Sequence, residues 1–247
     1  MTLKTIVKRF TPEIFLSQIR KARDKSRLTQ YKGLTVEVLF SNIYENNIWG
    51  APNDSAKPFF SGQGSHDNLI VLPYVQAVRE FLKSLEDLPN VVDLGCGDFN
   101  IGAQIRESCN EYIACDVVPK LIEFNRDQFK NLRVDFRLLD LARDELPPGD
   151  VVFIRQVLQH LSNHQIGNLV EKISSKYKYL VLTEELPCID KFKHNIDKAA
   201  GPDTRMRMGS GVVLTSAPFN LAVESEQTLC KISNGTSEIS TIIYRLC

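Results

Sequence analysis

The stretch Val91-Val92-Asp93-Leu94-Gly95-Cys96-Gly97-Asp98 determines how the rest of the chain is arranged. Its first residues read as a short buried strand, and the two glycines around Cys96 predict a tight turn. Apolar residues at Ile101 and Ile105 then predict a helix over residues 99–108. A strand, a glycine-rich turn and a helix form the opening unit of a parallel α/β fold, in which ligands bind beside such turns.

The strand predicted next, over residues 111–116, ends in Asp116, about 20 residues beyond the glycines, where an acid suits the hydroxyls of a ribose. Two nucleotide cofactors use this arrangement. The pyrophosphate of a dinucleotide needs bare N–H groups at a helix N-terminus, but Asp98 would repel it and Asn100 replaces a third glycine. S-adenosylmethionine has no phosphate, and its ammonium needs acceptors such as Asp93 and the carbonyls of the turn. The residues therefore favour S-adenosylmethionine. An ordinary strand–loop–helix junction, with Asp98 as N-cap, is the alternative.

Strand and helix patterns alternate beyond this turn. Such alternation predicts right-handed crossovers and a parallel sheet. The end of the chain differs, because short apolar runs there are separated by turn residues and predict an antiparallel hairpin. The predicted strands cover 91–95, 111–116, 133–138, 150–154 and 178–183, the helices between them 99–108, 119–129 and 165–176, and the final runs 219–224, 228–232 and 240–246.

The run from Asp93 to Asp98, followed by Asp116, resembles the first two motifs of class I S-adenosylmethionine-dependent methyltransferases. Asp140 falls where the third motif of this family places an acid or amide near the adenine, and residues 150–160 resemble its fourth motif. The resemblance covers roughly residues 91–185 and implies an α/β, Rossmann-like, seven-stranded and mostly parallel sheet with a terminal antiparallel hairpin. The cofactor it implies is S-adenosyl-L-methionine, bound by Asp93, Gly95, Cys96, Gly97, Asp116, Val117, Asp140, Leu141, Arg155 and Gln156.

Methylation of a hydroxyl is helped by a base that takes its proton. His160, just beyond the fourth predicted strand, is the first candidate, with a structural role for this histidine as the alternative. His66 and Asp67 are the second candidates, in the Gly-rich segment Ser61-Gly62-Gln63-Gly64-Ser65 and its continuation. That segment either folds over the cofactor or is a turn that caps the next helix. Trp49 is either a core anchor or a stacking platform.

A substrate-side insert is predicted over about 186–217, after the fifth strand. Its arginines Arg205 and Arg207, together with Ser65, are predicted to bind substrate, because guanidinium groups hold phosphate or carboxylate. A surface lid with no charge-specific role is the alternative. Asp190, Asp197 and Asp203 have no fixed metal-ligand spacing, so we expect no metal.

The composition is that of an ordinary protein with zero net charge, which makes nucleic acid an unlikely partner. Six cysteines without a C-x-x-C pair favour reduced thiols and a cytoplasmic location. Residues 1–34 carry nine lysines and arginines against two acids, which predicts either a solvated surface or contact with an anionic membrane. A helix is predicted over residues 12–25.

Two parts are expected: an N-terminal helical cap over residues 1–70 on the substrate side, and a methyltransferase domain over residues 71–247. Residues 42–50 and 61–65 are similar to segments of bacterial methyltransferases associated with surface glycans. The predicted function is methyl transfer to a hydroxyl of a small molecule or sugar, including a glycan or glycolipid precursor. RNA or protein methylation, and binding of S-adenosylmethionine without catalysis, are the alternatives.

Overall fold

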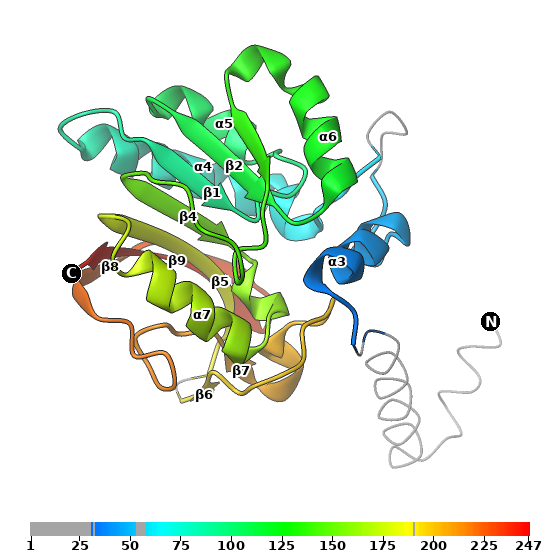
Figure 1. Cartoon of the computed structure of the whole chain (residues 1–247). Coiled ribbons are helices and arrows are strands. Elements are labelled where there is room, and N and C mark those ends of the chain that lie inside the picture. Colours follow the sequence, from blue (N-terminus) through cyan, green and yellow to red (C-terminus); the bar gives the residue numbers. More distant parts are fainter. Residues whose placement is uncertain (1–30, 32, 53–57, 190) are drawn as a thin grey trace. The chain divides into compact units, whose positions relative to one another are not determined.

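The computed structural model describes residues 31, 33–52, 58–189 and 191–247 (Figure 1). The chain divides into a segment of residues 1–34 and a compact body of residues 35–247, and the fold below is that of the body. The helix predicted over residues 12–25 lies outside the described residues, as does Asp190. No helix among the described residues is long and apolar enough to span a membrane.

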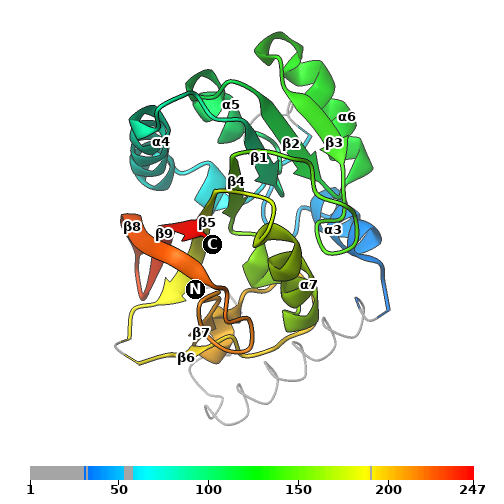
Figure 2. The same ribbon diagram turned by 60° about the vertical axis from the view of Figure 1, so that its left-hand side comes forward.

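Within the described residues, seven strands form one mixed sheet in the order β3-β2-β1-β4-β5-β9-β8 (Figure 2). The first five strands pair in parallel, whereas β9 runs antiparallel to both β5 and β8. The predicted parallel sheet with a closing hairpin is therefore confirmed. The strands are β1 Val91–Leu94, β2 Tyr112–Asp116, β3 Asp135–Leu138, β4 Val151–Arg155, β5 Tyr179–Pro187, β8 Val223–Asn234 and β9 Ser237–Leu246. Two short strands in the insert, β6 Lys193–His194 and β7 Ser210–Gly211, pair separately.

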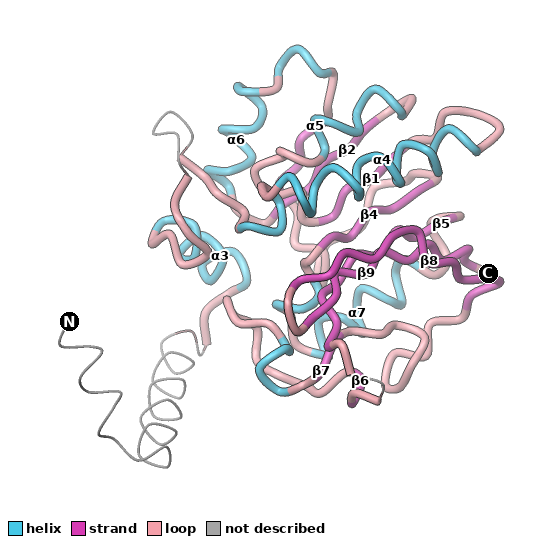
Figure 3. Tube along the Cα trace, turned by 180° about the vertical axis from the view of Figure 1, so that it is seen from behind, coloured by secondary structure: helices cyan, strands magenta, loops and turns pink. Residues whose placement is uncertain are grey.

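Helices cover both faces of the large sheet. Helix α4 lies on one face and α7 on the other, as the front and back views show (Figures 1 and 3). Val75, Val78 and Leu82 of α4 pack with Val91 and Phe153 of the central strands in one buried cluster. The α-helices of the body are α3 Val36–Glu45, α4 Asn68–Ser84, α5 Gly102–Ile105, α6 Pro119–Gln128 and α7 Asn163–Ile173.

The segment from residue 36 to residue 45 is the helix α3. Thr35 caps it by accepting the backbone N–H of Val38 at 3.3 Å. Leu39, Phe40, Ile43 and Tyr44 form its buried stripe, at the spacing of a helix face. At the other end of the chain, residues 219–222 are not a strand, and the two predicted runs 219–224 and 228–232 give one long strand, β8.

Helix α5 is shorter than the predicted helix 99–108 because of Phe99. This residue follows the glycine turn with a positive φ of 59° and is completely buried. Its ring packs among the rings of Tyr112, Phe129 and Phe136, with centroids 5.5, 5.2 and 4.9 Å away. A Cβ atom on Gly102 would lie 2.2 Å from this ring. The helix therefore begins with a glycine because the phenylalanine occupies the space in front of it.

We predict that Gly102→Ala lowers the free energy of unfolding by about 1–3 kcal/mol, because Phe99 is held by three rings and cannot give way. The matched control is Gly167→Ala in α7, where nothing lies within 4 Å of the added Cβ. That change should be neutral or stabilise the protein by up to about 1 kcal/mol. Urea denaturation measures both, and equal midpoints for the two variants would contradict this packing.

Candidate functional site

A pocket of ≈ 400 Å³ lies at the carboxyl ends of the parallel strands. The glycine turn after β1 and the ends of β2, β3 and β4 each contribute to its wall. Two sets of predicted residues meet there: all ten predicted to hold the cofactor, and His160 and Ser65. The ten are Asp93, Gly95, Cys96, Gly97, Asp116, Val117, Asp140, Leu141, Arg155 and Gln156.

Asp93 and Arg155 bring opposite charges to one region of the pocket wall. The Tyr112 hydroxyl donates to Asp93 Oδ2 at 3.0 Å. Burial raises the pKa of Asp93 to about 7, against the lowering effect of that hydrogen bond. Arg155 stacks on the Tyr74 ring, 4.8 Å from its centroid, and donates to the Gly64 carbonyl at 2.6 Å. Its buried Nε–H has no partner among the described residues, so it is available to donate a hydrogen bond to an anionic ligand.

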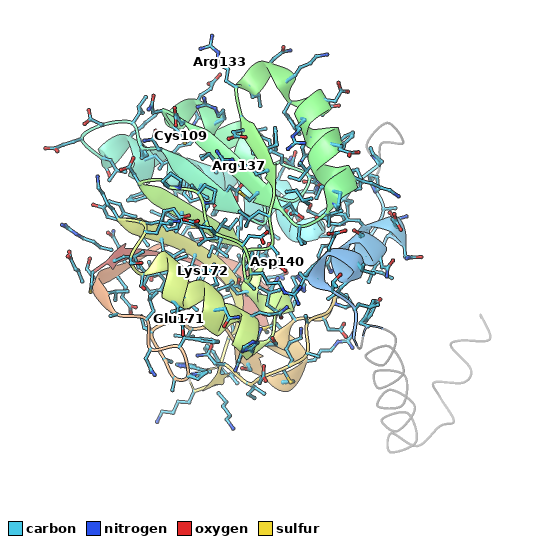
Figure 4. All side chains as sticks on the ribbon, in the orientation of Figure 1. Cys109, Arg133, Arg137, Asp140, Glu171 and Lys172 are labelled. Atoms are coloured by element: carbon cyan, nitrogen blue, oxygen red, sulfur yellow. The ribbon has the colours of Figure 1, made fainter. Side chains whose placement is uncertain are left out.

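Two further carboxylates stand at neighbouring strand ends. Asp116, the last residue of β2, accepts the backbone N–H groups of Gly97 at 3.0 Å and Val118 at 3.1 Å. Burial raises its pKa to about 6, although these hydrogen bonds oppose the shift. Asp140, labelled in Figure 4, follows β3 and accepts from the N–H of Ala142 at 3.0 Å. Because the backbone fixes both side chains, their remaining lone pairs have defined directions for hydroxyl or amino donors.

Residues 59–67, here called the strap, close over the glycine turn. Ser61 N–H donates to Asp98 Oδ2 at 2.9 Å, and Asp98 N–H donates back to Ser61 Oγ at 2.8 Å. A Cβ atom on Gly97 would lie 2.4 Å from Ser61 Oγ, so the strap can approach only because this residue is glycine. Asn100 Nδ2 adds a hydrogen bond to the Ser65 carbonyl at 2.7 Å.

His66 and Asp67, the second pair of predicted bases, hold the strap and do not line the pocket. His66 Nε2 lies 2.6 Å from Asp98 Oδ2, and its ring stacks on Phe60. Asp67 caps α4 by accepting the N–H of Leu69 at 2.9 Å. Both side chains are thus engaged in local structure.

His160 belongs to a cluster of rings, here called the aromatic wall, formed by Phe40, Tyr44, Trp49 and His160. The Trp49 ring lies 4.9 Å from the His160 ring and 5.4 Å from that of Tyr44. All four line the pocket, so the Trp49 ring is both packed against its neighbours and part of the pocket wall. This wall carries no formal charge, in contrast to the region of Asp93 and Arg155.

Backbone carbonyls of the insert orient the two polar rings of the wall. Trp49 Nε1–H donates to the Pro202 carbonyl at 3.2 Å, and His160 Nδ1 lies 3.2 Å from the Gly201 carbonyl. A carbonyl can only accept, so His160 carries its proton on Nδ1 and has a lone pair on Nε2. Burial, with Lys198 nearby, lowers the pKa of His160 to about 3 and keeps the ring neutral.

Arg205 has a different place from the one the sequence predicted. It is 1% exposed, does not line the pocket, and donates to the carbonyls of Leu158 and Leu161 and to Asn163 Oδ1. Its guanidinium therefore ties the insert to the turn that carries His160. Arg207 also lies outside the lining and pairs with Asp203 at 3.3 Å. The predicted substrate-binding role of both arginines has no support from their positions.

The sequence reading missed several residues of the pocket wall. Gln159 stands beside His160 in the fourth motif but was not singled out. Phe40 and Tyr44 are four residues apart, which is the spacing of one helix face and was the available signal. Among the described residues, no group of three or more His, Cys, Asp and Glu side chains could hold a metal ion.

Residues 92–178 match the model of a methyltransferase domain family. No match was found among curated proteins. The chain is structurally similar to the N-methyltransferase NodS from Bradyrhizobium japonicum WM9 in complex with S-adenosyl-L-homocysteine. The TM-score is 0.59 at 13% identity, over 84% of this chain and 98% of that one.

Two other structures have the same fold. The N-terminal domain of EvdMO1, in the presence of S-adenosylhomocysteine and D-fucose, gives a TM-score of 0.55 at 12% identity, covering 87% of this chain and 99% of that one. Magnesium protoporphyrin IX methyltransferase from Synechocystis PCC 6803, with bound S-adenosylmethionine, gives 0.53 at 14% identity, with the same two coverages of 87% and 99%. The methyltransferase-domain match over residues 92–178, on a sheet of this strand order, agrees with the predicted fold of a class I S-adenosylmethionine-dependent methyltransferase.

Proposed function

We propose that the chain transfers the methyl group of S-adenosylmethionine to a hydroxyl of a small polar molecule, such as a sugar. The observation that carries the proposal is that one pocket joins two chemically different regions. One region offers a carboxylate and a guanidinium, Asp93 and Arg155, and the other is the uncharged aromatic wall with the Nε2 lone pair of His160.

The charged region fits the amino-acid tail of S-adenosylmethionine. In this proposal Asp93 holds the ammonium, and Arg155 holds the carboxylate through its unpartnered Nε–H. Asp116 takes the ribose hydroxyls, while Val117, Asp140 and Leu141 surround the adenine. Gly95 and Gly97 allow close approach, and Gln156, at a positive φ of 54°, turns the chain after β4.

Cys96 also lines this region, between the two glycines. Burial raises the pKa of its thiol well above the usual value, so it stays protonated. We assign it a packing role beneath the cofactor.

S-adenosylmethionine, when bound, supplies an electrophilic methyl group whose carbon–sulfur bond breaks as the carbon–oxygen bond forms. The strap and the aromatic wall exclude water and hold the hydroxyl in line with the methyl group. Such positioning lowers the activation barrier by several kcal/mol. His160 Nε2 accepts a hydrogen bond from the hydroxyl, in place of the long 3.4 Å contact from Gln159 Nε2, and takes its proton as the oxygen becomes acidic. With a pKa of about 3 it is a weak base, so orientation is its larger contribution.

The acceptor region supports a sugar more than an ionic substrate. Aromatic rings offer an apolar surface to the C–H face of a sugar ring, and Gln159 and His160 offer polar atoms at its edge. The EvdMO1 domain, of the same fold, was obtained with D-fucose. NodS is an N-methyltransferase, so nitrogen is the competing acceptor atom.

The wider setting is also proposed. A glycan or glycolipid precursor in the cytoplasm is the acceptor we favour, and the basic segment 1–34 would meet the anionic carrier or membrane. In the same proposal, residues 1–70 form the substrate-side cap and residues 71–247 the methyltransferase domain. Methylation of RNA or protein and binding without catalysis are the competing functions. An acceptor assay distinguishes each of them from methylation of a small hydroxyl compound.

We predict that Arg155→Met weakens the binding of S-adenosylhomocysteine about tenfold or more, because its carboxylate loses the guanidinium partner. Isothermal titration calorimetry measures the affinity. The matched control is Arg137→Met in β3, whose half-exposed guanidinium pairs with Asp135 outside the pocket lining. Equal affinities of the two variants for S-adenosylhomocysteine would contradict the assignment of Arg155 to the cofactor site.

The affinity for S-adenosylhomocysteine is also expected to rise between about pH 5.5 and 7.5. Asp93 is protonated below its pKa of about 7, and only the carboxylate attracts the ammonium, so binding releases a proton in this range. Asp116, with a pKa of about 6, adds to the lower part of the rise. Asp93→Asn should weaken binding and flatten the upper part. Calorimetry in buffers of different ionisation enthalpy detects the released proton, and an unchanged profile in Asp93→Asn would exclude this pairing.

For catalysis, we expect His160→Phe to lower kcat by roughly 10–100-fold with little change in the affinity for S-adenosylhomocysteine. The substituted ring keeps the packing against Trp49 and removes the lone pair. His164→Phe, at an exposed position of α7, is the control and should leave kcat unchanged. Formation of S-adenosylhomocysteine is measured with an identified acceptor. Full activity of His160→Phe, together with lost activity of His66→Gln or Asp67→Asn, would show that the base is a residue of the strap and not His160.

A further inference from the structure

One hydrogen-bond acceptor in the pocket wall is left without a partner. Gln159 lines the pocket and is 6% exposed, and its Oε1 atom has no partner among the described residues. Leaving such an atom unpaired away from water is unfavourable, and native structures seldom do so without a reason. A ligand that brings a donor to this wall would satisfy it.

The surroundings of Gln159 fix which end of its amide is unpaired. Its Nε2 lies 3.4 Å from the Gln156 carbonyl oxygen and 3.4 Å from His160 Nε2. Both neighbours are acceptors, because the proton of His160 is on Nδ1, which faces the Gly201 carbonyl. With the amide turned over, Oε1 would face the lone pairs of the Gln156 carbonyl oxygen and His160 Nε2, and no hydrogen bond could form with either. The free acceptor is therefore a consequence of the site and does not depend on an arbitrary choice between oxygen and nitrogen.

The backbone beneath this side chain is held from both sides. Glu184, at 2% exposure, accepts the N–H groups of Leu158 at 2.9 Å and Gln159 at 3.0 Å. Arg205 donates to the Leu158 carbonyl at 2.9 Å. Two buried ionisable groups thus fix the turn that carries Gln159 and His160. A turn fixed in this way can present two adjacent side chains to a ligand at a constant separation.

From these contacts we infer that the acceptor is a vicinal diol on a ring, such as a pyranose or cyclitol. One hydroxyl donates to the single lone pair of His160 Nε2, in place of the long 3.4 Å contact from Gln159 Nε2, which keeps the Gln156 carbonyl as its partner. The neighbouring hydroxyl donates to Gln159 Oε1, and the ring lies against Trp49. Gln159 and His160 are adjacent in the chain, and Gln159 Nε2 lies 3.4 Å from His160 Nε2. Oε1 belongs to the same amide group, so the two acceptors are close enough together for hydroxyls on neighbouring carbons. The inference rests on the proposed hydroxyl methylation and assigns Gln159 as a specificity-determining residue.

The test compares acceptors that differ by one hydroxyl. The probes are methyl glycosides of D-fucose, D-galactose and L-rhamnose, with myo-inositol, the monodeoxy analogue of each, and benzyl alcohol as a single-hydroxyl probe. Release of S-adenosylhomocysteine gives kcat/KM for each compound. The wild-type protein should prefer a diol over its monodeoxy analogue roughly tenfold or more, because the analogue leaves Oε1 unpaired.

Gln159→Leu should lower kcat/KM for the diol roughly tenfold and give equal kcat/KM for the diol and its monodeoxy analogue. This is the result expected when the side chain and the hydroxyl are the two partners of one interaction. Gln159→Glu, which keeps an acceptor oxygen, should retain the preference. The control Gln76→Leu, on α4 beside Glu80, should match the wild-type protein. Binding of S-adenosylhomocysteine to each variant shows that the pocket is intact.

A diol preference that survives Gln159→Leu would overturn the assignment of Gln159. Turnover of benzyl alcohol without turnover of any diol would overturn the vicinal-diol inference while leaving the proposed hydroxyl methylation in place. Binding of S-adenosylhomocysteine with no turnover of any hydroxyl probe would overturn both.

Discussion

Ser61 and Asp98 exchange two hydrogen bonds, and this pair holds the strap on the glycine turn. The contact requires Gly97, because any side chain there would collide with Ser61 Oγ. Asp98 also holds His66, while Arg155 binds the Gly64 carbonyl from the far side of the strap. Two residues of this closure, Gly97 and Arg155, are also among those proposed to bind the cofactor. An acid at position 98 serves this closure, whereas it would have opposed the binding of a pyrophosphate.

The acceptor region depends on two buried ionisable groups at a greater distance along the chain. Arg205, Glu184 and the carbonyls of Gly201 and Pro202 come from β5 and the insert, yet they set the positions of His160 and Trp49. Removing either ionisable group would leave buried backbone groups unpaired, at a cost of about 1–3 kcal/mol for each. The insert therefore acts on the pocket through backbone hydrogen bonds, and its arginines support the wall from behind.

The sequence was informative where a general rule connects a residue to its place. Parallel strands bring their carboxyl ends to one edge, so Asp93, Asp116, Asp140 and Arg155 had to converge once the strand order was known. No such rule gives the partners of a long side chain. Arg205 finds the carbonyls of Leu158 and Leu161, more than forty residues earlier in the chain, and nothing local in the sequence distinguishes that from a surface guanidinium.

Local rules also competed with one another in the strap and in α5. Asp67 was both a plausible base and a plausible helix cap, and the cap is what the structure shows. The apolar pattern over 99–108 favoured a full helix, but the positive φ of Phe99 shortened it. Gln159 could not be found from sequence, because its free acceptor exists only through the His160 tautomer that the insert imposes.

The central claim is that one pocket holds the amino-acid tail of S-adenosylmethionine between Asp93 and Arg155 and directs the reacting centre toward the aromatic wall. A crystal structure with S-adenosylhomocysteine tests it most directly. The account predicts adenosine beside Asp116 and Asp140, the tail carboxylate on Arg155, and the sulfur facing Trp49 and His160. Adenosine elsewhere, or a sulfur turned away from the aromatic wall, would contradict it.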